Sequence, residues 1–351
     1  MEETPNPPHA FSPRLRFVDS SDIFWDEWRG TGLTGTAYFA ARNDKVPLIV
    51  AAQKNDLQTV QHLLASEEKI KLDEVGLEGE SALHMAAALG YLPVVEALIV
   101  AGANTSLQDI EGSTPLIHCA RFCPPEKSVD IAKALIAGGA SPLEAASYDL
   151  APVPVLGYAI QSFNLPLTQY LTPLTPLDYP TDLPNNRYIV TEALGAASRS
   201  HNGVVILKYL LEQGLPVQTT DLCRCTDVGL TDTETSFEVL HRHFVQAQQI
   251  STEELSSLTP SILHATRGAG KQLVPAFRAL VESYSVNPNH RDVAIAVLSL
   301  GQLDLLQTAI NSGLQLGTVL SVDEVRQIVN GRGRGKDFLQ LIRDQMGLPQ
   351  P

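Results

Sequence analysis

The chain has 351 residues, of which 44% are hydrophobic and 18% charged, and its formal net charge is −14. A nucleic-acid-binding protein needs a basic field, so this charge argues against nucleic-acid binding, and it also disfavours anionic membrane surfaces. Four cysteines are too few for a disulfide-built fold of this size. Neither a signal peptide nor a membrane span is predicted, so we expect a cytoplasmic or nuclear protein with reduced thiols.

The first 45 residues differ from the rest of the chain. Residues 1–15 hold four prolines and little apolar periodicity, so we expect a disordered tail. Residues 16–45 contain both tryptophans, Trp25 and Trp28, on a segment that a serine is suited to cap as a short helix. We predict that 16–45 is a helical cap on the end of the fold that follows, and the alternative is an aromatic docking patch.

Two consecutive segments then share one order of small and apolar residues. Residues 79–103 read GESALHMAAALGYLPVVEALIVAGA, and residues 112–140 read GSTPLIHCARFCPPEKSVDIAKALIAGGA. These segments resemble the ankyrin repeat, a unit of about 33 residues with a turn glycine, Thr-Pro-Leu-His, an alanine pair and a final Gly-Ala. The resemblance implies an all-α fold, an ankyrin-repeat solenoid of about seven partly degenerate repeats with helical caps.

Weaker copies of the same frame extend the predicted array over 46–317. They place apolar or small residues at matching positions, among them Ala51, Ala52, Leu156, Ala159, Leu194, Ala197, Leu263 and Val297. The second strong copy carries a four-residue insertion around Pro124 and Pro125, which we expect to lengthen the turn between its helices. Long loops are predicted at 172–190 and 218–234, and capping helices within 318–351.

Residue types within the strong copies fit paired helices that stack. Ala86 and Ala87 allow close approach to a neighbouring helix, and Gly102 lies where a second helix ends and a positive φ is common. His84 is expected to form hydrogen bonds within the turn, which is a structural role. A helical stripe is predicted to pack into the stack, formed by Val94, Val95, Leu98 and Ile99.

Motifs for chemistry are weak in this sequence. Two Cys or His pairs, 223 with 225 and 241 with 243, have one intervening residue, whereas zinc ligand pairs usually have two to four. The stretch 267–271, Arg-Gly-Ala-Gly-Lys, lacks the leading glycine, the Ser or Thr and the preceding strand of a phosphate-binding loop. We therefore predict no metal and no cofactor.

A groove formed by equivalent positions of successive repeats could still gather ionisable side chains. His118, Tyr158, Glu192 and His201 are the residues that such a groove could bring together, although no reaction motif connects them. An ankyrin-fold enzyme or small-molecule binder that uses the groove is therefore an alternative, which an enclosed cavity with ionisable residues would favour. A structural arm in a larger assembly is a third interpretation.

The resemblance implies protein binding through loop tips and the concave groove. Carried onto this sequence, the tip positions are Leu77, Glu78, Glu80, Ile110, Glu111 and Ser113, and the groove positions are Ala88, Leu89, Arg121 and Phe122. Acidic edges and apolar centres suit a protein partner with basic and apolar groups, rather than a nucleic acid or a membrane.

Overall fold

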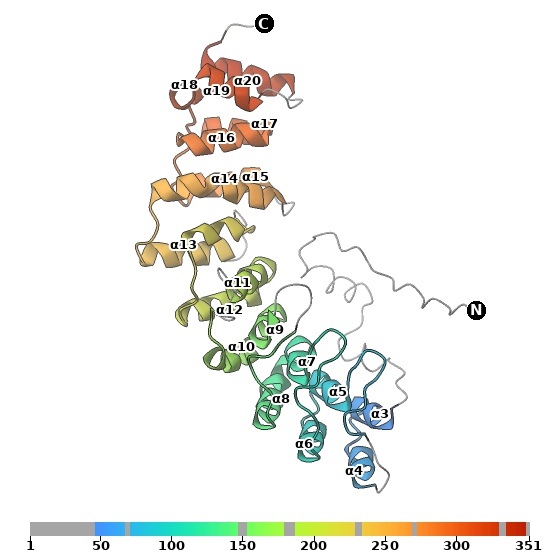
Figure 1. The fold of residues 1–351 in the computed structure, drawn as a ribbon. Helices are drawn as coiled ribbons and strands as arrows, with labels where there is room; N and C mark the ends of the chain where they lie inside the picture. The colour runs from blue at the N-terminus through green and yellow to red at the C-terminus, as the bar shows by residue number, and fades with distance from the viewer. Residues whose placement is uncertain are drawn as a thin grey trace, which may run out of the picture.

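The computed structural model describes residues 46–66, 71–146, 153–178, 187–228, 234–268, 272–329 and 335–348. The predicted tail, 1–15, and the predicted cap, 16–45, lie outside these residues. The described part is a stack of helix pairs (Figure 1), so the predicted all-α solenoid is confirmed. One short antiparallel ladder, β1 (Ala145–Ala146) with β2 (Val153–Pro154), lies between the third and fourth pairs.

Five pairs occupy the N-terminal part of the stack. They are α3 (Pro47–Gln53) with α4 (Leu57–Ala65), α5 (Ala82–Leu89) with α6 (Leu92–Val100), α7 (Pro115–Phe122) with α8 (Pro125–Ala137), α9 (Val155–Gln161) with α10 (Leu165–Leu171), and α11 (Tyr188–Arg199) with α12 (His201–Glu212). The first helix of each pair packs on the first helix of the next, and the second helices pack in the same way. We call the two columns the inner and outer helices, and the pairs units one to five.

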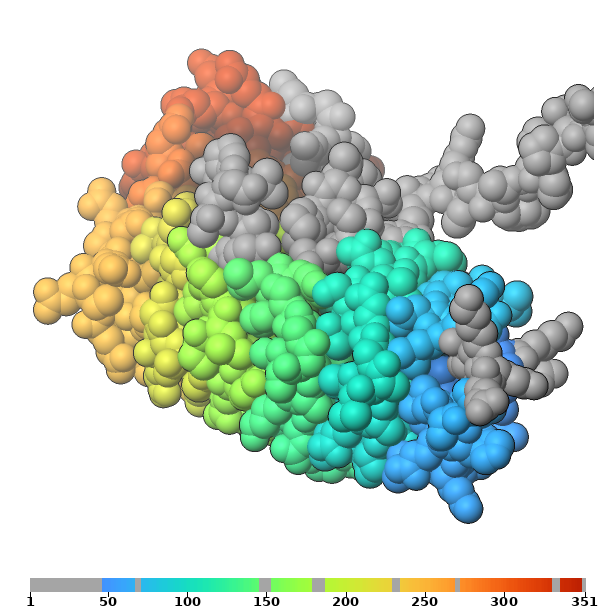
Figure 2. Space-filling view, turned by 60° about the horizontal axis from the view of Figure 1, so that its bottom comes forward, coloured from blue at the N-terminus to red at the C-terminus, as the bar shows by residue number. Residues whose placement is uncertain are grey.

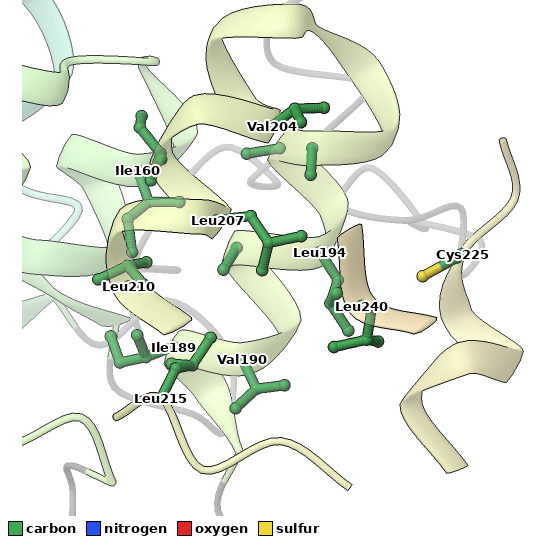
Figure 3. Packing of buried hydrophobic residues seen from close by; sticks show 14 of the residues in the cluster. Ile160, Ile189, Val190, Leu194, Val204, Leu207, Leu210, Leu215, Cys225 and Leu240 are labelled. Atoms are coloured by element: carbon green, nitrogen blue, oxygen red, sulfur yellow. The ribbon is translucent and has the colours of Figure 1, made fainter. Parts of the chain in front are cut away.

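The core runs continuously between the two columns. Small residues such as Ala86, Ala87 and Ala120 are fully or almost fully buried on the inner helices, which lets neighbouring units approach closely. Figure 3 shows Ile160, Leu194 and Leu207, contributed by α9, α11 and α12, in one cluster of buried side chains. Each unit therefore depends on its neighbours for burial, as expected for a solenoid.

A recurring backbone turn marks where helices of the array end. After α6, the N–H of Gly102 donates to the Ile99 carbonyl and the N–H of Ala103 donates to the Leu98 carbonyl. This is the Schellman motif, in which one residue has a positive φ. The same pair of bonds closes α8, α12 and α17 (Leu303–Asn311), with a glycine at the positive-φ position each time.

The same motif reveals a unit that the sequence frame does not show. It closes α13 (Ser236–Gln246), where Gln248 takes the positive φ of 55°. Helix α13 packs on α12, and the 3-10 helix η2 (Thr219–Arg224) packs on the inner helix that follows, α14 (Thr252–Gly268). We assign η2 and α13 to a sixth unit with a shortened inner element, so the expected count of seven repeats is not confirmed.

Polar contacts connect the sixth unit to the fifth. The carboxylate of Asp221, 1% exposed, accepts hydrogen bonds from both terminal nitrogens of Arg187, one of them at 2.7 Å. Arg224 donates to the hydroxyl of Thr191 across the same boundary at 2.6 Å. Because a six-residue 3-10 helix has little apolar surface to bury, these charge-assisted bonds contribute to holding the junction together.

The chain turns tightly between α11 and α12. Ser200 alone separates the two helices, ending the first and capping the second through its side chain. A Cβ atom on Gly203 would lie 2.1 Å from the carbonyl oxygen of Ala196, closer than any real contact. Glycine at position 203 therefore allows the first turn of α12 to pack directly on the backbone of α11.

The insertion in the third unit lies in a helix and not in the turn. Two residues separate α7 from α8, as two residues separate α5 from α6, but α8 has 13 residues and α6 has 9. The expectation of a longer turn is therefore wrong. Pro124 and Pro125 fit the start of α8, because proline is tolerated at the first helical position.

The C-terminal part continues the two columns. After α14 come α15 (Leu273–Glu282), α16 (Arg291–Leu300), α17, the short α18 (Leu316–Val319), α19 (Val322–Val329) and α20 (Lys336–Met346). Helix α19 packs on α16, and α20 packs on α17 and α18. Among the described helices, none has the length and apolar character needed to cross a membrane.

Candidate functional site

The loop tips of the second and third units project from the edge of the stack. Leu77 and Ile110 occupy equivalent positions 33 residues apart, and their side chains are 90% and 72% exposed. The N–H of Ile110 donates to the carbonyl of Glu78 at 3.0 Å, which fixes one tip against the next. Together with Val75, 43% exposed, these residues form what we call the tip ridge: Val75, Leu77, Glu78 and Ile110.

The ridge is acidic as well as apolar. Glu74 and Glu78 are exposed beside Leu77, and Asp73 is exposed and accepts a hydrogen bond from the backbone N–H of Asn104 at 2.9 Å. An exposed apolar group with carboxylates at its margin is complementary to an apolar side chain that has basic neighbours.

Two buried histidines hold the tips on the helices. His84 Nδ1 accepts from the backbone N–H of Ser81 at 3.1 Å, so its proton is on Nε2, which donates to the Ser113 carbonyl of the next tip at 3.1 Å. The predicted structural role of His84 in the turn is thus confirmed, and it extends to the neighbouring unit. Burial, with a smaller effect of nearby His118, lowers the pKa of His84 to about 3.

Asp109 stabilises the loop tip of the third unit through hydrogen bonds inside that loop. One carboxylate oxygen accepts the N–H groups of Glu111 and Ser113, each at 2.8 Å, and the other pairs with His118 Nε2 at 2.7 Å. Burial alone would raise the pKa of Asp109, but these hydrogen bonds lower it below its ordinary value. The tips are therefore rigid before any partner arrives, which reduces the entropy lost on binding.

Four of the ten expected contact residues are buried and cannot form a surface. Glu80 is 3% exposed and Ser113 fully buried at the base of the tips, while Ala88 and Leu89 are each 2% exposed in the core. The repeat frame gives their position in the unit correctly. However, these side chains pack within the stack, so we remove them from the expected site.

Arg121 and Phe122 lie beside the ridge, on the inner helix α7. The Arg121 guanidinium donates to Glu111 at 2.8 Å and lies over the rings of Phe122 and Tyr158, 4.9 and 5.3 Å from their centroids. Its side chain is only 12% exposed. Glu111 is therefore engaged within the fold and is not the separate acidic contact that the sequence suggested.

The inner face of units four to six carries further polar and aromatic contacts. Only some of the residues that the sequence was expected to bring together in a groove take part in them. Gln161 donates to Glu192 at 2.8 Å, linking α9 to α11, and Arg199 lies over the ring of Phe163 at 5.9 Å. Burial raises the pKa of Tyr158 to about 12. His201 is exposed at the start of the outer helix α12, so the four residues expected to converge in a groove do not all do so.

Comparison with known proteins identifies the repeats of units one to three. A family model for ankyrin repeats, with three copies, matches residues 48–145. Residues 48–145 are ankyrin repeats. The match spans units one to three and therefore includes the whole tip ridge and its histidine supports.

Three curated proteins of Mus musculus resemble parts of the chain. RelA-associated inhibitor is 37% identical over 113 residues, B-cell lymphoma 3 protein homolog 36% over 76, and Synphilin-1 45% over 49. The matches cover 32%, 22% and 14% of this chain, but only 13%, 16% and 5% of those proteins. A solved ankyrin repeat protein is 21% identical with a TM-score of 0.38, over 49% of this chain and 83% of that one.

The cysteine and histidine pairs noted in the sequence lie in and beside η2 and α13. Within the described residues, no group of three or more His, Cys, Asp or Glu side chains is arranged to hold a metal ion. His241 instead stacks on Phe237 and meets Tyr284 edge to face, while Cys225 is fully buried. Past the C-terminal ends of the outer helices α8, α10 and α12, a hollow of about 570 Å³ is lined by uncharged residues: Leu143, Thr172, Pro173, Leu174, Thr175, Pro176, Leu177 and Gln213.

Proposed function

We propose that the ankyrin repeats of this chain bind another protein through the tip ridge. The partner would present apolar side chains flanked by basic ones, with Arg121 and Phe122 contacting the margin of the interface. The observation that carries this proposal is the exposure of Leu77 and Ile110 at equivalent tips of consecutive units. Because these two side chains lie on adjacent tips beside Val75, they form a contiguous apolar patch, which is a feature of protein-binding sites.

Two further observations support a protein partner. His84 donates a buried hydrogen bond to the Ser113 carbonyl, and Asp109 accepts one from the Ser113 N–H, so the ridge is preorganised. One relative's name, RelA-associated inhibitor, also describes association with another protein. The match covers 13% of that relative, so we carry over only the type of ligand, a protein, and not its identity.

The test compares two sets of exposed apolar residues in the full chain. Leu77→Ser with Ile110→Ser removes the ridge, and Val100→Ser is the matched control, since Val100 is 88% exposed but lies at the end of the outer helix α6. Burying one Leu or Ile side chain contributes about 1.5–3 kcal/mol. We therefore expect the double variant to bind at least about tenfold more weakly, and the control to bind like the wild type.

Quantitative capture from cell extract would identify proteins retained by the wild type and by Val100→Ser but not by the double variant. Affinities are then measured with the purified partner. Glu78→Lys should also weaken binding, and the loss of affinity should be larger at low salt than at high salt, because the proposed contact is electrostatic. Equal capture by all variants would refute the tip ridge as the binding surface.

A further inference from the structure

The inner column of the stack is interrupted between units five and six. The inner helices α5, α7, α9, α11 and α14 each bury at least five residues, whereas η2 buries only Asp221 and Leu222. Each inner helix from α3 to α9 packs directly on the next, but η2 packs on α14 and has little backbone contact with α11. The space-filling view shows the units as successive bands of one wall, and this boundary lies where yellow-green passes into yellow (Figure 2).

The outer side of the same boundary is held by apolar packing. Helix α13 of unit six packs on both α11 and α12 of unit five. Leu240 of α13 and Leu194 of α11 belong to one cluster of buried side chains (Figure 3). Lys208 of α12 also pairs with Glu234, just before α13. The two sides of the boundary are therefore joined by different kinds of contact.

One arginine closes the inner side. Arg187, at the start of α11, donates to both carboxylate oxygens of Asp221, to the side-chain oxygen of Gln218 at 3.2 Å and to the Pro216 carbonyl at 2.9 Å. All of these acceptors lie in η2 or in the segment that leads into it. The side chain of Arg187 is 19% exposed and that of Asp221 is 2% exposed. A single side chain thus fixes the inner distance between the two units.

Asp221 would keep hydrogen-bond donors if Arg187 moved away. Breaking a buried ion pair is costly when it leaves the other charge without a partner. Here the backbone N–H of Gln218 donates to Asp221 at 2.8 Å, and Arg224 Nε lies 3.9 Å from the same carboxylate. Both donors belong to the same side of the boundary as Asp221. The bond from Arg224 to Thr191 crosses the boundary, and its loss would free Arg224 to pair with Asp221.

We propose that the boundary between units five and six is a hinge. Arg187 holds its inner side closed, and the pivot is the contact of α13 with α11 and α12. When Arg187 leaves Asp221, units one to five rotate relative to the following units, and the inner face widens between α11 and α14. The chain passes from unit five to unit six once, through residues 213–218, so one short connection has to follow the rotation. The tip ridge lies within units two and three, so the hinge does not depend on the function proposed above.

Distances between spin labels, measured by pulsed electron–electron double resonance in the full chain, test the hinge. Labels at Glu74→Cys and His264→Cys lie on opposite sides of the boundary, whereas Glu74→Cys with Glu212→Cys reports only on units two to five. All of these positions are exposed. Every variant also carries Cys223→Ser, because Cys223 is the native cysteine that is not buried.

Arg187→Gln removes the ion pair that closes the inner side. A rotation of about 15° moves atoms that lie about 20 Å from the pivot by about 5 Å, so the cross-boundary distance should shift and broaden by about that amount. The distance within units two to five should not change. Arg187→Lys should show a smaller effect, because lysine keeps the charge but cannot donate two parallel bonds. The matched control is Arg291→Gln, since Arg291 joins α16 to Glu324 of α19 on one side of the boundary.

Each outcome decides the proposal. A change confined to the cross-boundary distance, with none in Arg291→Gln, supports it. An unchanged cross-boundary distance in Arg187→Gln overturns it, because the packing of α13 would then fix the angle by itself. A broad distribution that is already present with Arg187 intact overturns it, and so does a change in both distances, which indicates general loss of packing. If far-UV circular dichroism shows that Arg187→Gln is unfolded, Arg187→Lys is judged by the same outcomes.

Discussion

Gly203 is the position where the packing of two helices permits the sharpest prediction. A Cβ atom there would lie 2.1 Å from the Ala196 oxygen and 2.3 Å from the Ala196 carbonyl carbon, and both are backbone atoms that cannot rotate away. Gly203→Ala must therefore push α12 away from α11 by more than 1 Å. Overpacking of this kind costs about 1–3 kcal/mol, while alanine recovers about 1 kcal/mol of helix propensity.

The expected net result is a loss of up to about 2 kcal/mol in the free energy of unfolding. Gly195 provides the control, because it lies in the partner helix α11 and its nearest neighbour would be the flexible end of Arg199 at 3.5 Å. Gly195→Ala should stabilise the protein by about 0.5–1 kcal/mol.

Urea unfolding followed by far-UV circular dichroism gives the midpoints of both variants. Hydrogen exchange of the α11 and α12 peptides locates the change, which matters because repeat arrays need not unfold as one unit. If Gly203→Ala were as stable as Gly195→Ala, the close approach of the two helices would be refuted.

Two more predictions concern the turns. Gln248 is exposed with a φ of 55°, so Gln248→Gly should raise the free energy of unfolding, measured with urea, by about 0.5–1 kcal/mol. Gln61→Gly on the exposed face of α4 should lower it by about 1 kcal/mol. Burial lowers the pKa of His84 to about 3, so below about pH 6.5 the unfolded chain takes up a proton that the folded chain does not. Stability should therefore fall as the pH decreases from 6.5 towards 3, by up to about 1.4 kcal/mol per pH unit, and the slope should be shallower in His84→Gln.

The fold was predictable wherever a unit keeps its small residues at fixed spacing. The alanine pair at 86 and 87 and the turn glycine at 102 directly reflect close helix packing and a positive φ, so the sequence shows them. The sixth unit was not recognised because its inner element is a six-residue 3-10 helix without an alanine pair, and Gln248 replaces the turn glycine. Its link to the fifth unit depends on Arg187 and Asp221, a long-range pair that no local pattern reveals.

The site was predictable only in part. The frame placed Leu77 and Ile110 at the tips correctly, because tips repeat every 33 residues in this region. It could not distinguish Glu78, which is exposed, from Glu80, which packs at the base of the tip. Burial at these positions depends on the neighbouring unit, and that contact is a property of the stack and not of one repeat.

The lengthened helix α8 indicates which insertions the array can accept. Four added residues amount to slightly more than one turn of 3.6 residues, so the side chains after them rotate by only about 40°. Ile131, Ala132 and Leu135 consequently face the core as Val94, Val95 and Leu98 do in α6. An addition of two residues would rotate the same side chains by about 200° and expose them. Length variation inside these helices is therefore restricted to whole turns, whereas the loops are free of this constraint.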